Sequence, residues 1–385
     1  MDKINNSDAI KLLQQVMRIP TVGADESKVA DVLAEKVQPL VDAGLVRLTR
    51  LPYAPGRDNL ILVAGPETAT TKLGIDGHMD VVEAGDPEKW QHDPFGAEIV
   101  DGILYGRGAT DMKAGLIASF VAFYNLVASG VELKSQLHFF ATVGEEVDNY
   151  GARQLAAAGY NEALTGLIVC EPSGPQIEPT TRGIIDYTVT AVGKAAHSST
   201  PEDGANAIAG LLAYNTATMT ATAPLTARVD SMLGHATHSI TLINGGNQVN
   251  IIPEFASLRG NIRTTPEADN AAFTAALEAA VAEANTMVPG VTLTLSVDST
   301  LPSVGSPADN RLVQTIQAAR VAQGMAEVPV VGGTGICDAA LLLRPGMDMA
   351  EYGPGNDTSH QTDENVAIAD FTEAIETYTT IFSTY

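Results

Sequence analysis

The sequence has few cysteines and few cations. Cys170 and Cys337 are the only two cysteines in 385 residues, so no disulfide framework can form, and we expect two reduced thiols. Lysine and arginine number 22 against 46 aspartates and glutamates, which gives a formal net charge of −24. A field of that sign repels nucleic acid and anionic membranes, so we expect neither as a partner.

Long apolar runs are also missing. No run reaches the ~18 residues that a membrane span needs. The first residues do not follow a signal-peptide pattern, because a cap at 5–8 precedes apolar residues at helical spacing from Ile10 to Met17. We therefore expect a cytoplasmic protein. Apolar residues still make up 45% of the chain, enough for a sizeable core. At roughly 150 residues per domain, the length suggests two domains.

The first and last parts of the chain alternate strands and helices. Residues 7–50 are predicted to form two helices, and Met112–Ala128 is apolar almost all round, which is typical of a buried helix. From Asn310 the pattern resumes with a helix, and a last helix is expected from Ile368. This order predicts an α/β domain with a mostly parallel sheet. Its strands are expected at 59–64, 72–76, 136–143, 167–170 and 328–331.

Residues 182–297 have a different pattern. Strands and helices follow one another in the order β-α-β-β-α-β, which is typical of a small α+β unit. We therefore expect residues 1–181 and 298–385 to form one domain, with 182–297 inserted into it. The strands are expected at 184–192, 239–243, 254–262 and 291–297, and the helices at 204–221 and 267–283.

Titratable side chains follow several of the expected strands. Each has an ordinary explanation when taken alone, as a loop histidine, a helix cap or a solvated acid. Ligand sites in open α/β sheets, however, gather at the carboxyl ends of strands. Two histidines with three carboxylates fit two divalent metal ions, of which zinc is the first expectation. One glutamate then remains free to act as a base. The candidates are His78, Asp80, Asp111, Glu145, Glu146, Glu171 and His360.

Five ordered motifs resemble those of the two-zinc amidohydrolase and metallopeptidase family. This family includes acetylornithine deacetylase, succinyl-diaminopimelate desuccinylase, aminoacylase, glutamate carboxypeptidase and peptidase T. The resemblance covers essentially the whole chain. It implies a zinc-peptidase-like catalytic domain, interrupted at 182–297 by a lid that also forms a homodimer. The motifs are Gly77-His78-Met79-Asp80, Asp93-Pro94-Phe95, the run 101–108 leading to Asp111-Met112-Lys113, Gly144-Glu145-Glu146, and 193–201 around His197.

The resemblance implies a role for each candidate. His78 and Glu171 would hold one metal ion, Glu146 and His360 the other, and Asp111 would bridge the two. In the catalytic step, Asp80 would orient His78 and Glu145 would act as the general base. His197 would reach the active site of the partner subunit and stabilise the oxyanion. A cis peptide bond is also expected between Asp111 and Met112. The residues that resemble substrate contacts are Asn250, Arg263, Gly333, Thr334 and Asn356.

These features predict a hydrolase that cleaves the amide bond of an N-acyl amino acid, with two Zn²⁺ (or Co²⁺ or Mn²⁺) as its cofactor. The expected substrate class is that of acetylornithine deacetylases or desuccinylases. A di- or tripeptidase acting on a short peptide is the alternative. A non-catalytic metal-binding homologue is the rival outside enzymes, and it would be marked by loss of Glu145 or a ligand. Desuccinylases carry two arginines where this chain has Thr181-Arg182-Gly183, which weakens the case for a succinyl group. The sequence lacks the Gly-x-Ser-x-Gly motif of α/β serine hydrolases, so we do not expect a serine hydrolase.

Overall fold

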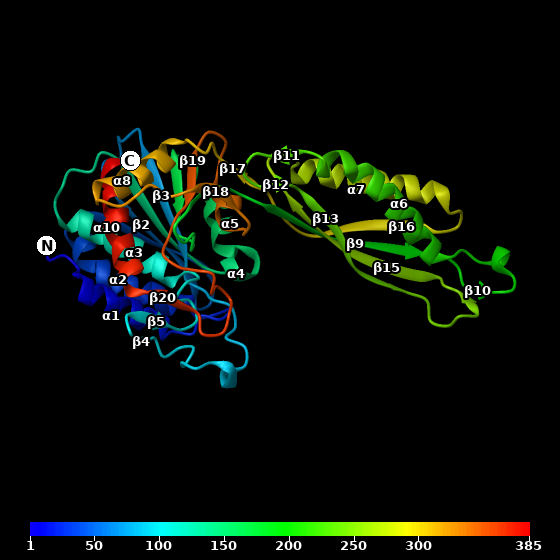
Figure 1. The fold of residues 1–385 in the computed structure, drawn as a ribbon, viewed down its shortest axis with the longest axis horizontal. Coiled ribbons are helices and arrows are strands. Elements are labelled where there is room, and N and C mark those ends of the chain that lie inside the picture. The colour runs from blue at the N-terminus through cyan, green and yellow to red at the C-terminus, as the bar shows by residue number, and fades with distance from the viewer. The chain divides into compact units, whose positions relative to one another are not determined.

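The computed structural model describes residues 1–385, which divide into two compact units. The larger unit comprises Met1–Thr180, Ser306–Gly333 and Cys337–Tyr385, and the inserted unit comprises Thr181–Gly305 with Thr334–Ile336. Figure 1 labels many of the elements of both units. None of the helices combines the length and the apolar character that crossing a membrane requires.

The larger unit is built on a mixed sheet whose centre is parallel. Seven strands follow one another in the order β1-β2-β6-β3-β7-β19-β8, and β18 also pairs with β8. β3 runs parallel to both β6 and β7, and β7 runs parallel to β19. The strands are β1 (Val46–Ala54), β2 (Arg57–Ala64), β3 (Lys72–His78), β6 (Gln136–Thr142), β7 (Gly166–Val169), β8 (Ile177–Thr181), β18 (Val330–Gly333) and β19 (Asp348–Glu351).

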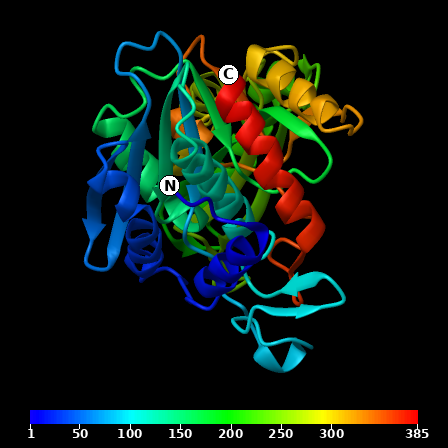
Figure 2. The ribbon, with the colours of Figure 1, turned by 90° about the vertical axis from the view of Figure 1, so that its left-hand side faces the viewer.

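Helices pack on this sheet around one hydrophobic core. α3 is buried along almost its whole length because it packs against α10, α1 and β3. Figure 2 shows α10 running beside α3. The helices are α1 (Asn6–Met17), α2 (Glu26–Asp42), η1 (Pro87–Lys89), α3 (Lys113–Ala128), α4 (Glu145–Asp148), α5 (Tyr150–Ala157), α8 (Arg311–Ala322), α9 (Ala339–Leu342) and α10 (Ile368–Thr384).

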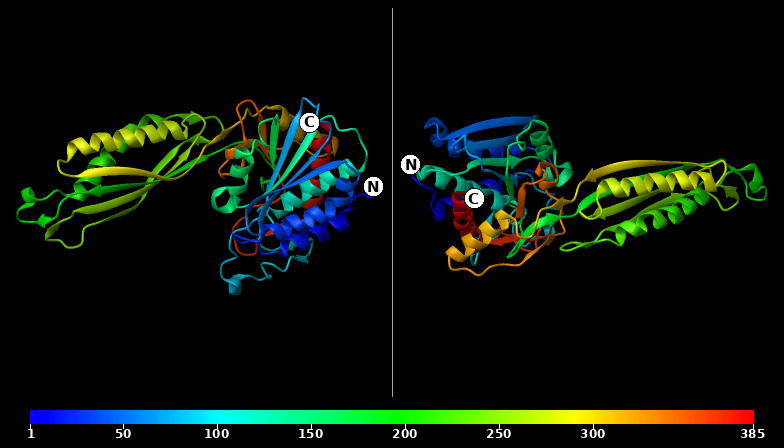
Figure 3. Two further views of the ribbon diagram at one scale, coloured as in Figure 1. Left: turned by 180° about the vertical axis from the view of Figure 1, so that it is seen from behind. Right: turned by 90° about the horizontal axis from the view of Figure 1, so that it is seen from above.

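The inserted unit is a four-stranded antiparallel sheet with two helices on one face (Figure 3). Its sheet order is β13-β15-β9-β16, which leaves β13 at an edge. The β-α-β-β-α-β order predicted from the sequence is confirmed. The elements are β9 (Gly183–Val192), β10 (Ala196–His197), η2 (Pro201–Asp203), α6 (Ala207–Thr226), β11 (Val229–Asp230), β12 (Gly234–His235), β13 (Thr237–Gly245), β14 (Ile251–Ile252), β15 (Phe255–Thr264), α7 (Asn270–Met287), β16 (Thr292–Leu301) and β17 (Val304–Gly305).

The two helices predicted within residues 7–50 are present as α1 and α2, and β1 begins before residue 50, because α2 ends at Asp42 and Gly44 turns the chain with a φ of 71°. Two other local predictions were wrong. The stretch between His78 and Asp111 is not all loop, since β4 (Glu98–Val100) and β5 (Ile103–Tyr105) form a hairpin that β20 (Asn365–Ala367) joins. The inserted unit extends past residue 297 because β16 continues to Leu301 beside β9.

Candidate metal centre

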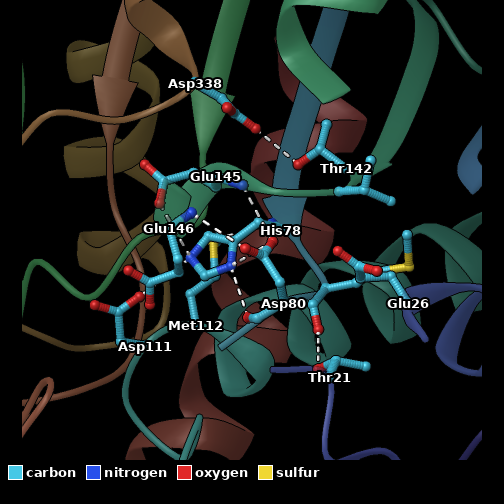
Figure 4. Close-up of polar contacts among 12 residues, drawn as sticks. Thr21, Glu26, His78, Asp80, Asp111, Met112, Thr142, Glu145, Glu146 and Asp338 are labelled. Atoms are coloured by element: carbon cyan, nitrogen blue, oxygen red, sulfur yellow. Dashed lines mark hydrogen bonds and ion pairs between the residues drawn. The ribbon is translucent and has the colours of Figure 1, made fainter. Parts of the chain in front are cut away.

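The parallel centre of the sheet brings the motif residues to one edge. His78 is the last residue of β3, which lies between β6 and β7. Glu145 opens α4 just after β6, and Glu171 follows β7 by two residues. Because parallel strands end at the same edge, residues far apart in sequence converge there. Figure 4 shows several of these side chains gathered around His78.

Asp111 lies between two imidazoles. Its Oδ1 is 3.1 Å from Nε2 of His78, and its Oδ2 is 3.3 Å from Nε2 of His360. The peptide bond between Asp111 and Met112 is cis, as the resemblance implied. Each oxygen of one carboxylate thus faces a different histidine, which is the arrangement that a ligand bridging two metal ions needs.

Two glutamates complete the surroundings of these imidazoles. Oε1 of Glu171 is 3.6 Å from Nε2 of His78, and Glu146 lies 3.1 Å from Nε2 of His360. Oε2 of Glu145 is 3.9 Å from the same nitrogen of His78. Two overlapping groups could hold an ion, with ligand atoms within 4.8 Å of one another: His78, Glu145 and Glu171, and His78, Asp111 and Glu146. The candidate base therefore lies only 0.3 Å farther from this nitrogen than the ligand candidate Glu171 does.

The electrostatics of this cluster fit a divalent cation. Burial raises the pKa of Glu145 and that of Glu171 well above the usual value, and His78 only partly opposes this. Hydrogen bonds to Asp111 and Glu146 raise the pKa of His360 to about 10. The carboxylates thus draw protons onto themselves and onto the imidazoles, because the chain supplies too little positive charge here. Metal ions would supply that charge, and the donor set of imidazole and carboxylate suits zinc.

Asp80 differs from its expected role. Nδ1 of His78 is 3.0 Å from the backbone carbonyl oxygen of Asp80, whereas it is 3.6 Å from the carboxylate, which is beyond a good hydrogen bond. The Asp80 carboxylate instead accepts hydrogen bonds from the backbone N–H groups of Glu145 (3.2 Å) and Glu146 (3.1 Å). Asp80 therefore fixes the turn that presents both glutamates, while its carbonyl group orients the histidine.

A buried network behind Glu145 was not predicted. The side-chain amide of Asn149 donates to Oε1 of Glu145 at 3.3 Å and to Oδ1 of Asp338 at 2.9 Å. Oδ2 of Asp338 accepts a hydrogen bond from the Thr142 hydroxyl at 2.7 Å (Figure 4). The nearest sequence signal is the position of Asn149, four residues after Glu145. Asp338 follows Glu145 by nearly 200 residues, so no local pattern indicates the contact.

The inserted unit brings two other predicted residues together. β10 pairs with β14, which puts His197 opposite Ile251, and the N–H of Ser198 donates to the Asn250 carbonyl oxygen at 3.0 Å. His197 and Asn250 are both exposed, and Nδ1 of His197 is 2.7 Å from the Ser199 hydroxyl oxygen.

The remaining predicted contacts are dispersed. Arg263 lies apart from His197 and Asn250, on β15, where it faces Ile184 of β9. Gly333 ends β18, and Thr334 follows it. The side chain of Asn356 orders the loop before His360, because its amide donates to the carbonyl oxygen of Asn365 at 3.0 Å.

Comparison with known families identifies the chain. The sequence profile described as peptidase family M20/M25/M40 matches residues 74–384. The chain belongs to this family. As an M20 metallohydrolase it is an enzyme that hydrolyses amide or peptide bonds.

Individual relatives span the whole chain. A probable succinyl-diaminopimelate desuccinylase from Staphylococcus epidermidis is 31% identical over 415 residues, covering 100% of this chain and 99% of the relative. Among solved M20-like structures, the aminopeptidase PepT from Bacillus cereus has a TM-score of 0.78 at 21% identity, with 99% and 98% of the two chains covered. A dinuclear metal-binding M20 peptidase from Bacillus subtilis has a TM-score of 0.70 at 17% identity, with 98% and 97% covered.

Proposed function

We propose that the chain hydrolyses the amide bond of N-acyl amino acids, with two Zn²⁺ as its cofactor. The observation that carries this proposal is the Asp111 carboxylate, whose two oxygens face His78 and His360 separately. Glu171 would complete one metal site and Glu146 the other. Metal ions held there would polarise the amide carbonyl group and lower the pKa of a water molecule, so that the water can lose a proton and attack the carbonyl carbon.

The protein's own groups would then move the proton. Glu145 would accept the proton of the attacking water and pass it to the leaving nitrogen. Asn149 holds one Glu145 oxygen at 3.3 Å, which leaves the other oxygen, 3.9 Å from His78, to face the reacting atoms. His197 would donate a hydrogen bond to the developing oxyanion.

Two arginines bear on the substrate. Arg182 donates to the backbone carbonyl oxygens of Leu233 and His235, so its guanidinium is occupied and is a poor candidate for binding a succinyl carboxylate. The Arg263 side chain makes no hydrogen bond or ion pair within the chain, and the residue is partly exposed. Its planar guanidinium is therefore available to bind the carboxylate of an amino acid bidentately. This favours an N-acyl amino acid with a small acyl group, such as acetyl, over N-succinyl substrates.

A peptidase is the second candidate. It is supported by the similarity to the aminopeptidase PepT over almost the full length of both chains. The same Arg263 would then bind the C-terminal carboxylate of a short peptide, so this contact alone does not separate the two activities.

We also propose a homodimer formed through the inserted unit. Its edge strand β13 exposes Leu242 (54%) and Ile243 (61%), and α6 exposes Leu212 (59%). An edge strand with unpaired backbone groups and exposed apolar side chains is suited to pair with a second copy. In such a dimer His197 would act on the centre of the partner subunit.

The buried free thiols Cys170 and Cys337 are consistent with a reducing, cytoplasmic location.

A substrate panel tests the proposal. Metal-stripped protein is reloaded with Zn²⁺, Co²⁺ or Mn²⁺ and assayed on N-acetylornithine, N-succinyl-diaminopimelate, other N-acyl amino acids, dipeptides and tripeptides. We expect the highest kcat/KM on an N-acyl amino acid with a small acyl group, and no turnover by Glu145→Gln at equal metal content. Turnover of peptides alone would establish the peptidase instead. No turnover of any substrate by fully loaded protein would indicate a non-catalytic homologue.

A further inference from the structure

Glu364 is a fully buried carboxylate that lies beside the candidate bridging residue but does not point into the metal cluster. Its Oε1 accepts two backbone hydrogen bonds, from the N–H of Thr110 at 2.9 Å and from the N–H of Asp111 at 2.8 Å. Its Oε2 accepts a hydrogen bond from Nη1 of Arg107. Both oxygens are thus engaged by the chain, so Glu364 is not available as a further metal ligand.

We propose that Glu364, held by Arg107, is the positioning residue that fixes the Asp111 carboxylate for metal binding. This inference rests on the proposed role of Asp111 as the bridge between two metal ions. A bridging carboxylate must keep both oxygens aimed at separate sites, and its side chain can do so only if its backbone is held. The two N–H groups bound by Glu364 belong to Asp111 and to the residue before it, which fixes that backbone.

Arg107 is in turn held from three directions. Its guanidinium donates to Glu364 and, through Nη2, to the Glu83 carbonyl oxygen at 3.2 Å, and it lies 5.4 Å from the centre of the Trp90 ring. Only 2% of Arg107 is exposed. An arginine fixed in this way can hold a buried carboxylate in one orientation, because its charge offsets that of the glutamate and its geometry allows little rotation.

The same anchor joins Asp111 to the segment that carries His360. β20 begins at Asn365 and pairs with Tyr105 of β5, and the N–H of Gly106 donates to the Glu364 carbonyl oxygen at 2.8 Å. The Thr110 hydroxyl donates to the carbonyl oxygen of Asn365 at 2.6 Å. Two ligand candidates about 250 positions apart in sequence are therefore set in register by contacts around one glutamate.

Only a carboxylate can make this set of contacts. The groups that face Glu364 are all donors: two backbone N–H groups on one oxygen and a guanidinium on the other. A glutamine offers one accepting and one donating end, so it must turn an N–H toward another donor whichever way it sits. Aspartate keeps both oxygens but is one methylene shorter, so it cannot reach both sides at once.

Metal binding by the full-length protein tests the proposal without any substrate. The affinity of metal-stripped protein for Zn²⁺ is measured by competition with a chromogenic chelator, for wild type, Glu364→Gln and Arg107→Lys. Changes in residues that orient metal ligands typically cost 10–100-fold in metal affinity. We expect a loss of about 10-fold or more for Glu364→Gln. Arg107→Lys keeps the charge but makes fewer hydrogen bonds, so we expect a smaller loss.

Glu26→Gln is the matched control. Glu26 is equally buried, and its ion pair with Arg57 is also flanked by aromatic rings, but neither oxygen of Glu26 accepts a backbone hydrogen bond from a ligand candidate. The control should lose thermal stability with little change in Zn²⁺ affinity. Wild-type affinity in a folded Glu364→Gln protein would overturn the proposal, as would equal losses in the control. If Glu364→Gln does not fold, the Zn²⁺ affinity of Arg107→Lys is the test, and wild-type affinity in that folded variant would overturn the proposal. Absence of amide hydrolysis by zinc-loaded wild type would refute the proposed function and leave this result unaffected.

Discussion

Glu351 provides a sharp test of the electrostatics of the larger unit. It is 6% exposed on β19, directly opposite Glu178 of β8, and its Oε1 accepts a hydrogen bond from the Cys337 thiol at 2.8 Å. Burial raises the pKa of Glu351 from 4.5 to about 8, the Cys337 hydrogen bond opposes the shift, and the facing Glu178 adds to it. The folded protein therefore keeps a proton on this pair at pH values where the unfolded chain has lost it.

The sign of the stability effect follows from that difference. A carboxyl group whose pKa is higher in the folded state contributes stability below pH 4.5, and this contribution is lost as the pH rises toward 8. Between these two pH values, each pH unit changes the free energy of unfolding by up to about 1.4 kcal/mol for one titrating group. Between pH 5.5 and 7.5 this pair should therefore lower the free energy of unfolding by roughly 2–3 kcal/mol.

Glu351→Gln should remove this pH dependence. The amide imitates the protonated acid, since its oxygen can accept from Cys337 while its N–H₂ donates to Glu178. We expect the variant to match wild type near pH 5 and to be more stable by roughly 2–3 kcal/mol at pH 7.5. Urea unfolding of metal-stripped protein measures this. Trp90 is the only tryptophan and lies buried in the same unit as Glu351, so its fluorescence follows the relevant transition.

The control is Glu283→Gln, an exposed position on α7 of the inserted unit, which should leave the pH profile unchanged. If Glu351→Gln and wild type lose stability in parallel from pH 5.5 to 7.5, the pair does not hold a proton in the folded state and the reasoning is refuted.

Three further changes test the site and the packing behind it. Glu145→Gln should keep its metal and lose on the order of 10²-fold or more in kcat, because the proton acceptor is gone; normal turnover at equal metal content would exclude Glu145 as the base. His197→Ala should lose ~10²–10³-fold in kcat, and mixing it with Glu145→Gln should restore partial activity through hybrid dimers, unless the site lies within one chain. Gly115→Ala would place a methyl group 1.9 Å from the Cys170 carbonyl oxygen, so its Tm should fall by several degrees; an unchanged Tm would show that α3 can shift.

Much of the fold follows from local patterns, and its errors have identifiable causes. β3, β6 and β7 are apolar and bounded by turn residues, so they were predicted close to their true limits. The β4–β5 hairpin was missed although Asp101 and Gly102, both with positive φ, form the Asp-Gly turn that signals a tight hairpin. β19 has only four residues and no alternation, so its central place in the sheet depends on pairing with β7, which no local pattern encodes.

The residues of the candidate site also fall into two groups: those that local motifs reveal and those that only the folded chain brings into place. The ligand candidates lie in compact motifs and could be named from the sequence, and their convergence follows from parallel strands ending at one edge. The residues that hold them could not be named. Asp80 was assigned to His78, but its carboxylate binds the backbone of Glu145 and Glu146, because the first N–H groups of a helix need acceptors. Glu364 accepts a hydrogen bond from the backbone N–H of Asp111, which lies 253 positions earlier in the sequence, and only the folded chain brings the two together.

The position of β19 also has a consequence for synthesis. This strand lies between β7 and β8 in the sheet, yet the ribosome makes it after the whole inserted unit. The inserted unit can therefore fold while the larger unit still has a gap at its centre and an unpaired edge along β7, a form open to pairing with other chains. His360 and Glu364 emerge later still. A nascent or truncated chain that stops before residue 348 should thus need chaperone protection, and the candidate metal centre can be completed only after residue 364 has been synthesised.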